Sequence, residues 1–154
     1  DIFLNDIQSR EKKNGRELIK ELLLSKEDGR IKLFLIYKVL EARRRNPGVF
    51  SKGKYIPLDV EGKGRRHVIA FARNAGGQWA ISIAPRFLTR LVDGESFPLG
   101  PSVWEDTSLL LPKKNPSIWK DIFSDRIIRG KNSLLIADIL THFPVALLLN
   151  RRRD

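Results

Sequence analysis

The chain has 154 residues, of which 42% are hydrophobic and 31% are charged, and its formal net charge is +11. This length is usual for one domain and allows about 70% of the unfolded surface to be buried, while the spread of apolar residues along the whole chain argues against general disorder. Because there is no cysteine, disulfides, thiolate metal sites and cysteine nucleophiles are excluded.

No targeting segment is recognisable. No apolar run reaches the roughly 18 residues that span a bilayer, and residues 1–6 lack the basic and apolar regions of a secretory signal. The chain also contains no methionine, as a fragment or trimmed chain would. We therefore expect a folded, soluble, cytoplasmic piece of a longer protein.

Two helices are predicted at the start of the chain. Residues 16–24 place leucine and isoleucine at i, i+4 spacing, which is typical of an amphipathic helix. Residues 31–45 are apolar on nearly all faces, with Asp28 as the candidate N-cap and three arginines near the helix C-terminus, where they complement its dipole. Pro47 disfavours helix at the residue before it.

The helix over residues 31–45 has more apolar surface than one contact with a small sandwich covers. Large exposed apolar patches are rare on soluble monomers. We therefore expect self-association through the N-terminal helices, in a surface that would otherwise lie against a larger domain. The side chains concerned are Leu33, Phe34, Ile36, Tyr37 and Leu40.

Strand patterns replace helical periodicity after Gly48. Residues 67–84 predict an antiparallel hairpin around Asn74-Ala75-Gly76-Gly77, and residues 85–107 predict a largely irregular excursion. The hairpin core is expected to contain Ile69, Phe71, Trp79, Ile81 and Ile83. Further short strands are predicted at 54–59, 108–111, 126–129, 133–136 and 144–149, with a helical turn at 137–142.

Motifs for phosphate, metal or triad chemistry are not found. Gly62-Lys63-Gly64 precedes a strand and Gly76-Gly77 lies inside a hairpin, so both are interpreted as turns rather than phosphate loops. His67 and His142 have no partner at metal-ligand spacing and no nucleophilic serine motif nearby. We predict no metal ligands, no cofactor-binding residues and no cofactor.

Glycoside chemistry needs two carboxylates roughly 5 to 9 Å apart across a sugar. The candidates have simpler interpretations as turn residues or local hydrogen-bond acceptors, so no catalytic residue is assigned. These candidates are Asp93, Asp106, Asp121 and Asp138.

Aromatic side chains offer a second route to carbohydrate, since they stack on sugar rings. In a sandwich of this size most are expected to belong to the core. The residues are Tyr55, Trp79, Phe87, Trp104 and Trp119.

The high positive charge raises nucleic-acid binding as an alternative. The densest basic clusters lie at element ends and turns, where solvated charge is ordinary, so nucleic acid is not the favoured partner. They are Arg43-Arg44-Arg45, Lys63 with Arg65 and Arg66, and Arg151-Arg152-Arg153.

A series of segments in fixed order resembles the C-terminal region of maltooligosyltrehalose synthases, which belong to the α-amylase superfamily. The resemblance covers about residues 27–149, and the order and spacing of the segments carry it. The segments are Glu27–Tyr37, Arg43–Phe50, Gly53–Leu58, His67–Arg73, Trp104–Thr107, Leu109–Pro112, Trp119–Asp121, Leu134–Leu140 and Phe143–Leu148.

The resemblance implies an intramolecular transglycosylase that converts the reducing-end α-1,4 linkage of a maltooligosaccharide into an α,α-1,1 linkage, an isomerase step of trehalose biosynthesis. In that family the catalytic carboxylates lie on a (β/α)8 barrel, upstream of the part that this chain matches. Such a barrel needs roughly 250 residues, so no catalytic residue is transferred to this chain. The parent would be an enzyme, and the fragment alone would not.

We therefore expect an α+β fold in which N-terminal helices precede a mostly antiparallel β-sandwich. Residues 1–47 would correspond to the last helices of the barrel and residues 48–154 to the C-terminal sandwich domain. The expected partner is the parent's catalytic barrel, and the parent's substrate is a maltooligosaccharide. The alternatives are a stand-alone glucan-binding module and a basic nucleic-acid-binding domain.

Overall fold

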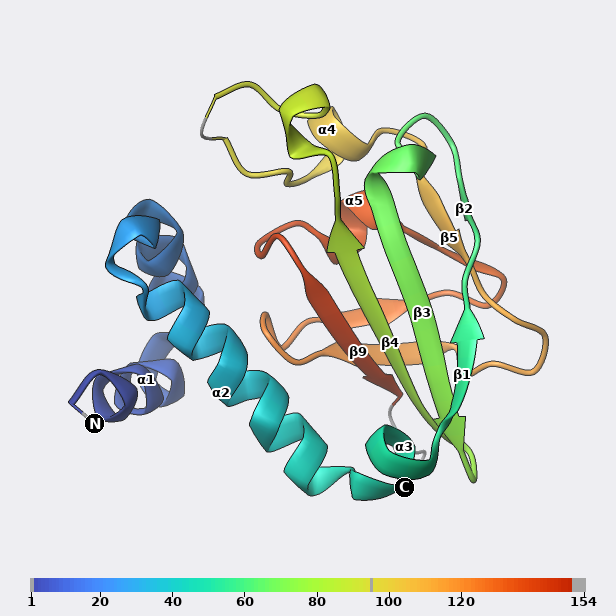
Figure 1. The fold of residues 1–154 in the computed structure, drawn as a ribbon, viewed down its shortest axis with the longest axis horizontal. Coiled ribbons are helices and arrows are strands. Elements are labelled where there is room, and N and C mark those ends of the chain that lie inside the picture. Colours follow the sequence, from blue (N-terminus) through green and yellow to red (C-terminus); the bar gives the residue numbers. More distant parts are fainter. Residues whose placement is uncertain (1, 95, 151–154) are drawn as a thin grey trace. The chain divides into compact units, whose positions relative to one another are not determined.

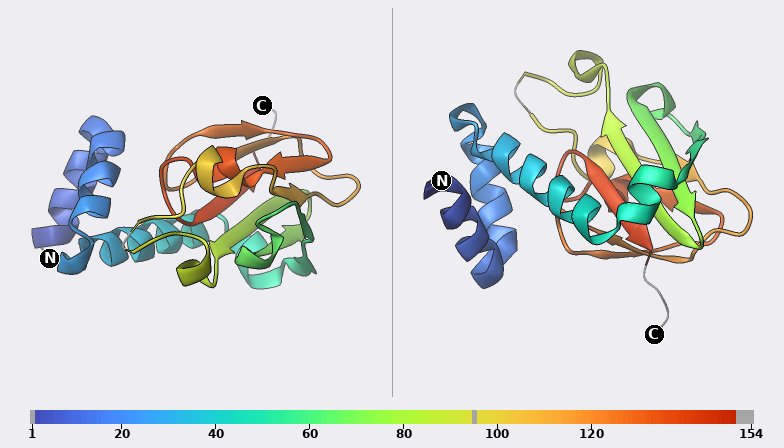
Figure 2. Two further views of the ribbon diagram at one scale, coloured as in Figure 1. Left: turned by 90° about the horizontal axis from the view of Figure 1, so that it is seen from above. Right: turned by 60° about the horizontal axis from the view of Figure 1, so that its bottom comes forward.

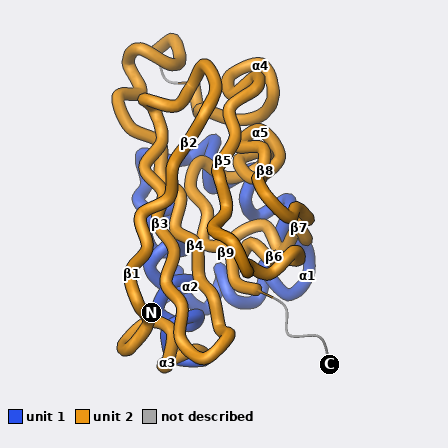
Figure 3. The backbone as a smooth tube through the Cα atoms, turned by 90° about the vertical axis from the view of Figure 1, so that its right-hand side faces the viewer, with its two compact units in different colours: residues 1–45 blue, residues 46–154 orange. Residues whose placement is uncertain are grey.

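The computed structural model describes residues 2–94 and 96–150. Two compact units divide the chain, Asp1–Arg45 and Asn46–Asp154 (Figure 3). The first unit is helical, and every strand of the described residues lies in the second. The order of helices followed by antiparallel sheets confirms the predicted α+β class.

Helix α1 (Ile2–Leu24) is longer than the predicted segment 16–24 and is kinked at Asn14, where φ is −159° and ψ is 81°. The Asn14 side-chain oxygen accepts a hydrogen bond from the backbone N–H of Glu17 at 3.3 Å, so Asn14 acts as the N-cap of the second half. The buried side chains of α1 are Ile7, Leu18, Ile19 and Leu22.

Helix α2 (Arg30–Arg45) follows a short 3-10 turn, η1 (Lys26–Asp28), and packs against α1. Asp28, the predicted N-cap of this helix, lies in η1 and is separated from α2 by Gly29. Asp28 accepts a hydrogen bond from the backbone N–H of Arg30 at 2.9 Å, while the Gly29 carbonyl accepts the first helical bonds. Gly29 has φ of 79°, a left-handed conformation that glycine adopts without strain.

Ion pairs join the helical segments of the first unit. Glu21 accepts hydrogen bonds from Arg10 and Arg30, each at 2.9 Å to Oε1. The hydrogen bond from Arg10, and to a smaller extent that from Arg30, lowers the pKa of Glu21 to about 2. Lys38 on α2 pairs with Glu11 on α1, with both side chains largely buried.

The chain from residue 47 forms a helix that the sequence analysis did not predict. Helix α3 (Pro47–Lys52) begins with proline at its first position, where the missing N–H is not needed. It packs against β3 (Val68–Ala75) and β4 (Gln78–Pro85). Val49 is its buried residue.

The larger sheet has six strands in the order β1-β3-β4-β9-β6-β7, and its paired strands are antiparallel. The predicted hairpin is confirmed: β3 and β4 pair over their whole length around Gly76 and Gly77, which have φ of 55° and 81°, as a type I′ turn requires. Figures 1 and 2 show β3, β4 and β9 side by side. The remaining strands are β1 (Lys54–Pro57), β6 (Ile118–Asp121), β7 (Ile127–Arg129) and β9 (Ala146–Asn150).

A smaller sheet has the order β2-β5-β8. Its strands are β2 (Val60–Glu61), β5 (Ser108–Leu110) and β8 (Ser133–Leu135), and α5 (Ile136–Ile139) follows at once. Side chains of both sheets form one core, in which Leu109 and Leu134 join Ile81 and Ile83. Strands β2 and β6 were not predicted.

The excursion between β4 and β5 is largely irregular, as predicted. It contains a 3-10 turn, η3 (Leu88–Arg90), and a short helix, α4 (Pro101–Trp104). Trp104 is fully buried, and its Nε1 donates a hydrogen bond to the Pro98 carbonyl at 2.8 Å. This residue anchors the excursion to the core.

The predicted hairpin core is right for β4 and wrong for β3. Ile81 and Ile83 are buried, and Trp79 packs partly against the core. On β3 the core-facing residues are Val68, Ala70 and Ala72, and Ala70 lies opposite Ile83. The larger side chains point the other way: Ile69 is 49% exposed, and Phe71 is half-buried against Tyr55.

Candidate functional site

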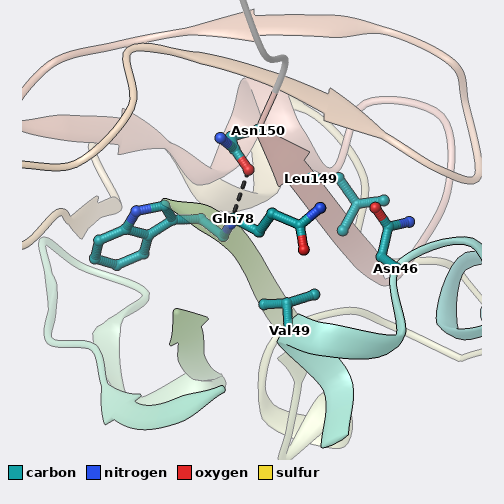
Figure 4. Close-up of a pocket in the computed structure, with 6 residues that line it drawn as sticks. Asn46, Val49, Gln78, Leu149 and Asn150 are labelled. Carbon is teal, nitrogen blue, oxygen red and sulfur yellow. Dashed lines mark hydrogen bonds between the residues drawn. The ribbon is translucent and has the colours of Figure 1, made fainter. Parts of the chain in front are cut away.

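A pocket of about 250 Å³ lies at the end of the larger sheet, where α3 approaches β4 and β9 (Figure 4). Three of its six lining residues are side-chain amides. The lining residues are Asn46, Val49, Gln78, Trp79, Leu149 and Asn150.

Helix α3 supplies one wall. Asn46 precedes Pro47 and has φ of −129° and ψ of 53°, outside the helical region that proline disfavours for the residue before it. Gly48 lies so close to the pocket that a Cβ there would be 3.5 Å from the Gln78 Oε1. Figure 4 shows the Gln78 amide extending toward Asn46 and Leu149, with Val49 on the side of α3.

The ends of β4 and β9 supply the other wall, and the side chain of Asn150 joins them by hydrogen bonds. Its Oδ1 accepts a hydrogen bond from the Trp79 backbone N–H at 2.8 Å, and its Nδ2 donates to the Gly77 carbonyl at 3.1 Å. Side chains alternate along a strand, so Gln78 and Trp79 face opposite sides of the sheet. The indole of Trp79 accordingly packs against the core.

The chemistry of this lining is neutral. None of the six lining residues is ionisable, so they provide no general acid, general base or charged nucleophile. Amide groups both donate and accept hydrogen bonds, and Val49 and Leu149 add apolar surface. The arrangement can bind a neutral ligand but has no group for acid–base catalysis.

The four carboxylates weighed from the sequence lie in different settings. Asp106 lies in a turn, as predicted, and its side chain accepts a long-range hydrogen bond from the Lys63 backbone N–H at 3.0 Å. Asp93 and Asp138 are exposed, and the Asp138 carbonyl accepts a bond from Arg126 Nη1 at 2.5 Å.

Asp121 differs from the other three because it is buried at the end of β6. Its Oδ2 accepts hydrogen bonds from the backbone N–H and the hydroxyl of Ser124, at 3.0 and 2.6 Å, which fixes the β6–β7 turn. Its Oδ1 has no partner among the described residues. Burial raises the pKa of this carboxyl despite those bonds.

The aromatic residues divide into core and surface. Trp104 and Trp119 are fully buried, as expected. Tyr55 is 56% exposed with its ring 5.1 Å from that of Phe71, and Phe87 is 61% exposed with the Arg86 guanidinium 5.0 Å from its ring.

The histidines and glycine turns lie outside the pocket. His67 Nδ1 is 3.3 Å from the Arg86 carbonyl oxygen, and His142 is half-buried. A Cβ on Gly62 would lie 2.8 Å from the Asp106 carbonyl oxygen, so glycine is required in that turn. No three metal-ligating side chains gather within the described part of the chain.

The basic clusters occupy the ends of elements. Arg43, Arg44 and Arg45 are exposed at the end of α2. Lys63 pairs with Glu105, which raises the Lys63 pKa, and Arg65 and Arg66 lie in a 3-10 turn, η2 (Arg65–His67). The Arg151-Arg152-Arg153 cluster lies outside the described residues.

A second concavity, the α1–α2 groove, belongs to the helical unit and has a volume of about 380 Å³. Two of the residues predicted for self-association, Ile36 and Leu40, are 45% and 58% exposed there, whereas Phe34 is buried. The groove is lined by Leu4, Gln8, Leu33, Ile36, Tyr37, Leu40, Glu41 and Arg44.

No helix in the described ranges has the length and hydropathy to cross a membrane.

Comparison with solved structures shows which folds this chain is similar to. The solved structure of a mutant of maltooligosyltrehalose synthase from Arthrobacter ramosus is similar, with a TM-score of 0.61 and 23% sequence identity over 87% of this chain and 17% of that chain. A maltogenic alpha-amylase from Thermotoga neapolitana gives a TM-score of 0.47 and 16% identity over 75% of this chain and 24% of that chain. No protein-family model matches the chain, and no curated protein matches its sequence.

The first of these likenesses shows the fold alone, helices followed by mostly antiparallel sheets. The chain spans 17% of the length of that synthase.

The amide residues of the pocket were not singled out from the sequence. Asn46 is separated from Gln78 by 32 positions and from Asn150 by 104, and no local motif links them. Only the tertiary pairing of β4 with β9 brings them together. The Gly76-Gly77 turn was the one local signal that located this end of the sheet.

Proposed function

We propose that residues 1–154 form the closing, non-catalytic part of a larger cytoplasmic α-amylase-type enzyme similar to maltooligosyltrehalose synthase. The whole enzyme would isomerise the reducing-end α-1,4 linkage of a maltooligosaccharide to an α,α-1,1 linkage. Residues 1–47 would complete its (β/α)8 barrel, and residues 48–154 would form the sandwich that follows. The catalytic carboxylates would lie in the barrel.

One observation carries this proposal: 87% of this chain matches the synthase structure, yet that match occupies 17% of the synthase. Glycoside chemistry in the amylase-type barrel uses paired carboxylates, and the pocket in the second unit has none. A supporting role is therefore favoured over an independent catalytic one.

The α1–α2 groove adds physical support. Ile36 and Leu40 are exposed on α2, and the groove also includes Leu4 and Leu33. Single exposed leucines are ordinary, but several lining one groove are typical of a surface that meets another domain. The barrel would cover this face in the whole enzyme, and a second copy would cover it in the isolated chain.

The coding sequence upstream of Asp1 tests the proposal. The expected result is a continuous reading frame that encodes a (β/α)8 barrel of roughly 250 residues or more. A frame that opens directly before Asp1, or one that encodes an unrelated domain, would overturn it.

A further inference from the structure

The amide-lined pocket at the end of the larger sheet has a role that domain support does not require. We infer that it is a subsite for a single neutral glucosyl residue, remote from any chemistry. The choice of glucose as the sugar rests on the proposed function, and the choice of a neutral, hydroxyl-rich ligand rests on the lining itself.

The six residues that line the pocket carry no charge, although Lys and Arg exceed Asp and Glu by 29 to 18 in this chain. An anionic ligand would lose water there without gaining a cationic partner from these six described residues, which is costly. A neutral polyol avoids that cost.

The side-chain amide of Gln78 provides hydrogen-bonding capacity in the pocket. The Gln78 backbone carbonyl accepts a bond from Asn74 Nδ2 at 3.1 Å, but its side-chain amide has no partner among the described residues. This half-buried amide faces the pocket (Figure 4). Its NH2 group can donate a hydrogen bond to one sugar hydroxyl, and its carbonyl oxygen can accept one from another, because hydroxyl groups both donate and accept.

The pocket also has the size and the apolar surface for one sugar ring. Leu149 lies opposite Ala80 in the β4–β9 pairing, so it shares the Gln78 face of the sheet, and Val49 of α3 adds further apolar surface to the lining. These two side chains suit the C–H face of a sugar ring. The volume of about 250 Å³ is below the roughly 300 to 1,000 Å³ of drug-sized sites, so one ring fits rather than a glucan chain.

Asn150 holds the subsite open rather than supplying its specificity. Its Oδ1 and Nδ2 both bond to the hairpin backbone, at 2.8 and 3.1 Å. The specificity group is therefore Gln78, and its substitution should weaken binding without removing the Asn150 bonds.

The test is a titration of residues 1–154 with maltose, followed by NMR of the side-chain amide and backbone signals. A ligand that buries about one ring should bind with a dissociation constant on the order of millimolar. The expected shifts are confined to the lining residues, with the Gln78 side-chain amide among them. Shifts spread elsewhere, or none at saturating maltose, would overturn the inference.

Two comparisons sharpen the test. Gln78→Leu preserves size and should weaken maltose binding by about tenfold, whereas Gln8→Leu, which removes the chain's other glutamine in the α1–α2 groove, should leave it unchanged. Glucuronate should bind at least about tenfold more weakly than maltose. Equal or tighter glucuronate binding would show non-specific attraction to a basic protein and would contradict the subsite.

If Gln78→Leu fails to fold, the NMR titration of the unmodified protein with maltose still tests whether the pocket binds sugar. Failure here is distinguishable from failure of the proposed function, because the upstream reading frame is read independently. Maltose binding without an upstream barrel would identify a stand-alone glucan-binding module instead of an enzyme part.

Discussion

The side chain of Asn150, at the end of β9, accepts a hydrogen bond from the backbone N–H of Trp79 at 2.8 Å. This bond joins positions 71 apart and extends the β4–β9 pairing beyond its last backbone partners, Ala80 and Leu149. It fixes the end of the hairpin at which the amide-lined pocket lies.

Asn150→Ala should destabilise the chain by about 1 to 3 kcal/mol, because the Trp79 N–H and the Gly77 carbonyl lose their partner. Urea denaturation followed by tryptophan fluorescence measures the loss. Asn132→Ala is the control, since Asn132 is exposed, and its effect should stay within about 0.5 kcal/mol. Equal effects of the two substitutions would mean that the Asn150 bonds contribute nothing specific.

The two faces of the hairpin should differ in their response to truncation. Ile81 is 1% exposed, so Ile81→Ala should cost about 2 to 5 kcal/mol. Phe71 is half-buried, so Phe71→Ala should cost about 2 kcal/mol, less than the roughly 3 to 5 kcal/mol of a buried phenylalanine. Denaturation of both variants tests this assignment, and a larger loss for Phe71 than for Ile81 would reverse it.

This division of β3 explains why the sequence pattern predicted the hairpin but not its inward face. Both faces of residues 68–72 are apolar, so alternation does not distinguish them. Ala72 and Ala70 face the core because they lie opposite Ile81 and Ile83, whose larger side chains fill the space. That pairing of small with large residues is a property of two strands together.

The helices were predictable to a similar degree. The periodicity of residues 16–24 and 31–45 located α1 and α2, whereas residues 2–13 and 47–52 gave no comparable signal. The pocket was not predictable, because Asn46, Gln78 and Asn150 come from separate elements and single amides carry no motif. The two-residue glycine turn was predictable because its chemistry is local.

Asp121 should make stability depend on pH. Burial raises the pKa of Asp121 in the folded state above its ordinary value of about 3.8, so the folded state holds the proton more tightly than the unfolded state. Stability from this group is therefore greatest below about pH 3.8 and falls as pH rises through the folded pKa. Asp121→Asn removes this titration.

The measurement is the free energy of unfolding of Asp121→Asn and of the unmodified chain between about pH 3.5 and 7. The substitution should be more destabilising at the acidic end than at neutral pH. A difference that grows with rising pH would contradict the raised pKa. Ser124→Ala, which removes the 2.6 Å bond to Asp121 Oδ2, should raise that pKa further.

The isolated chain should self-associate through the α1–α2 groove. Leu40 is 58% exposed in it, so Leu40→Asp should disrupt association without unfolding α2. Leu24→Asp is the matched control, because Leu24 is 88% exposed and does not line the groove. Analytical ultracentrifugation at micromolar concentration should show a dimer or larger species that Leu40→Asp alone converts to monomer; a monomer in every sample would contradict the prediction.

The most direct test of the central claim, that this chain supports chemistry located elsewhere, is an assay for loss of reducing ends from maltopentaose. Under the proposed function the paired carboxylates would lie in an upstream barrel, so residues 1–154 alone should give no turnover above blank, and a polypeptide extended upstream through that barrel should give turnover. Activity of residues 1–154 that a single carboxylate substitution within them abolishes would contradict the claim.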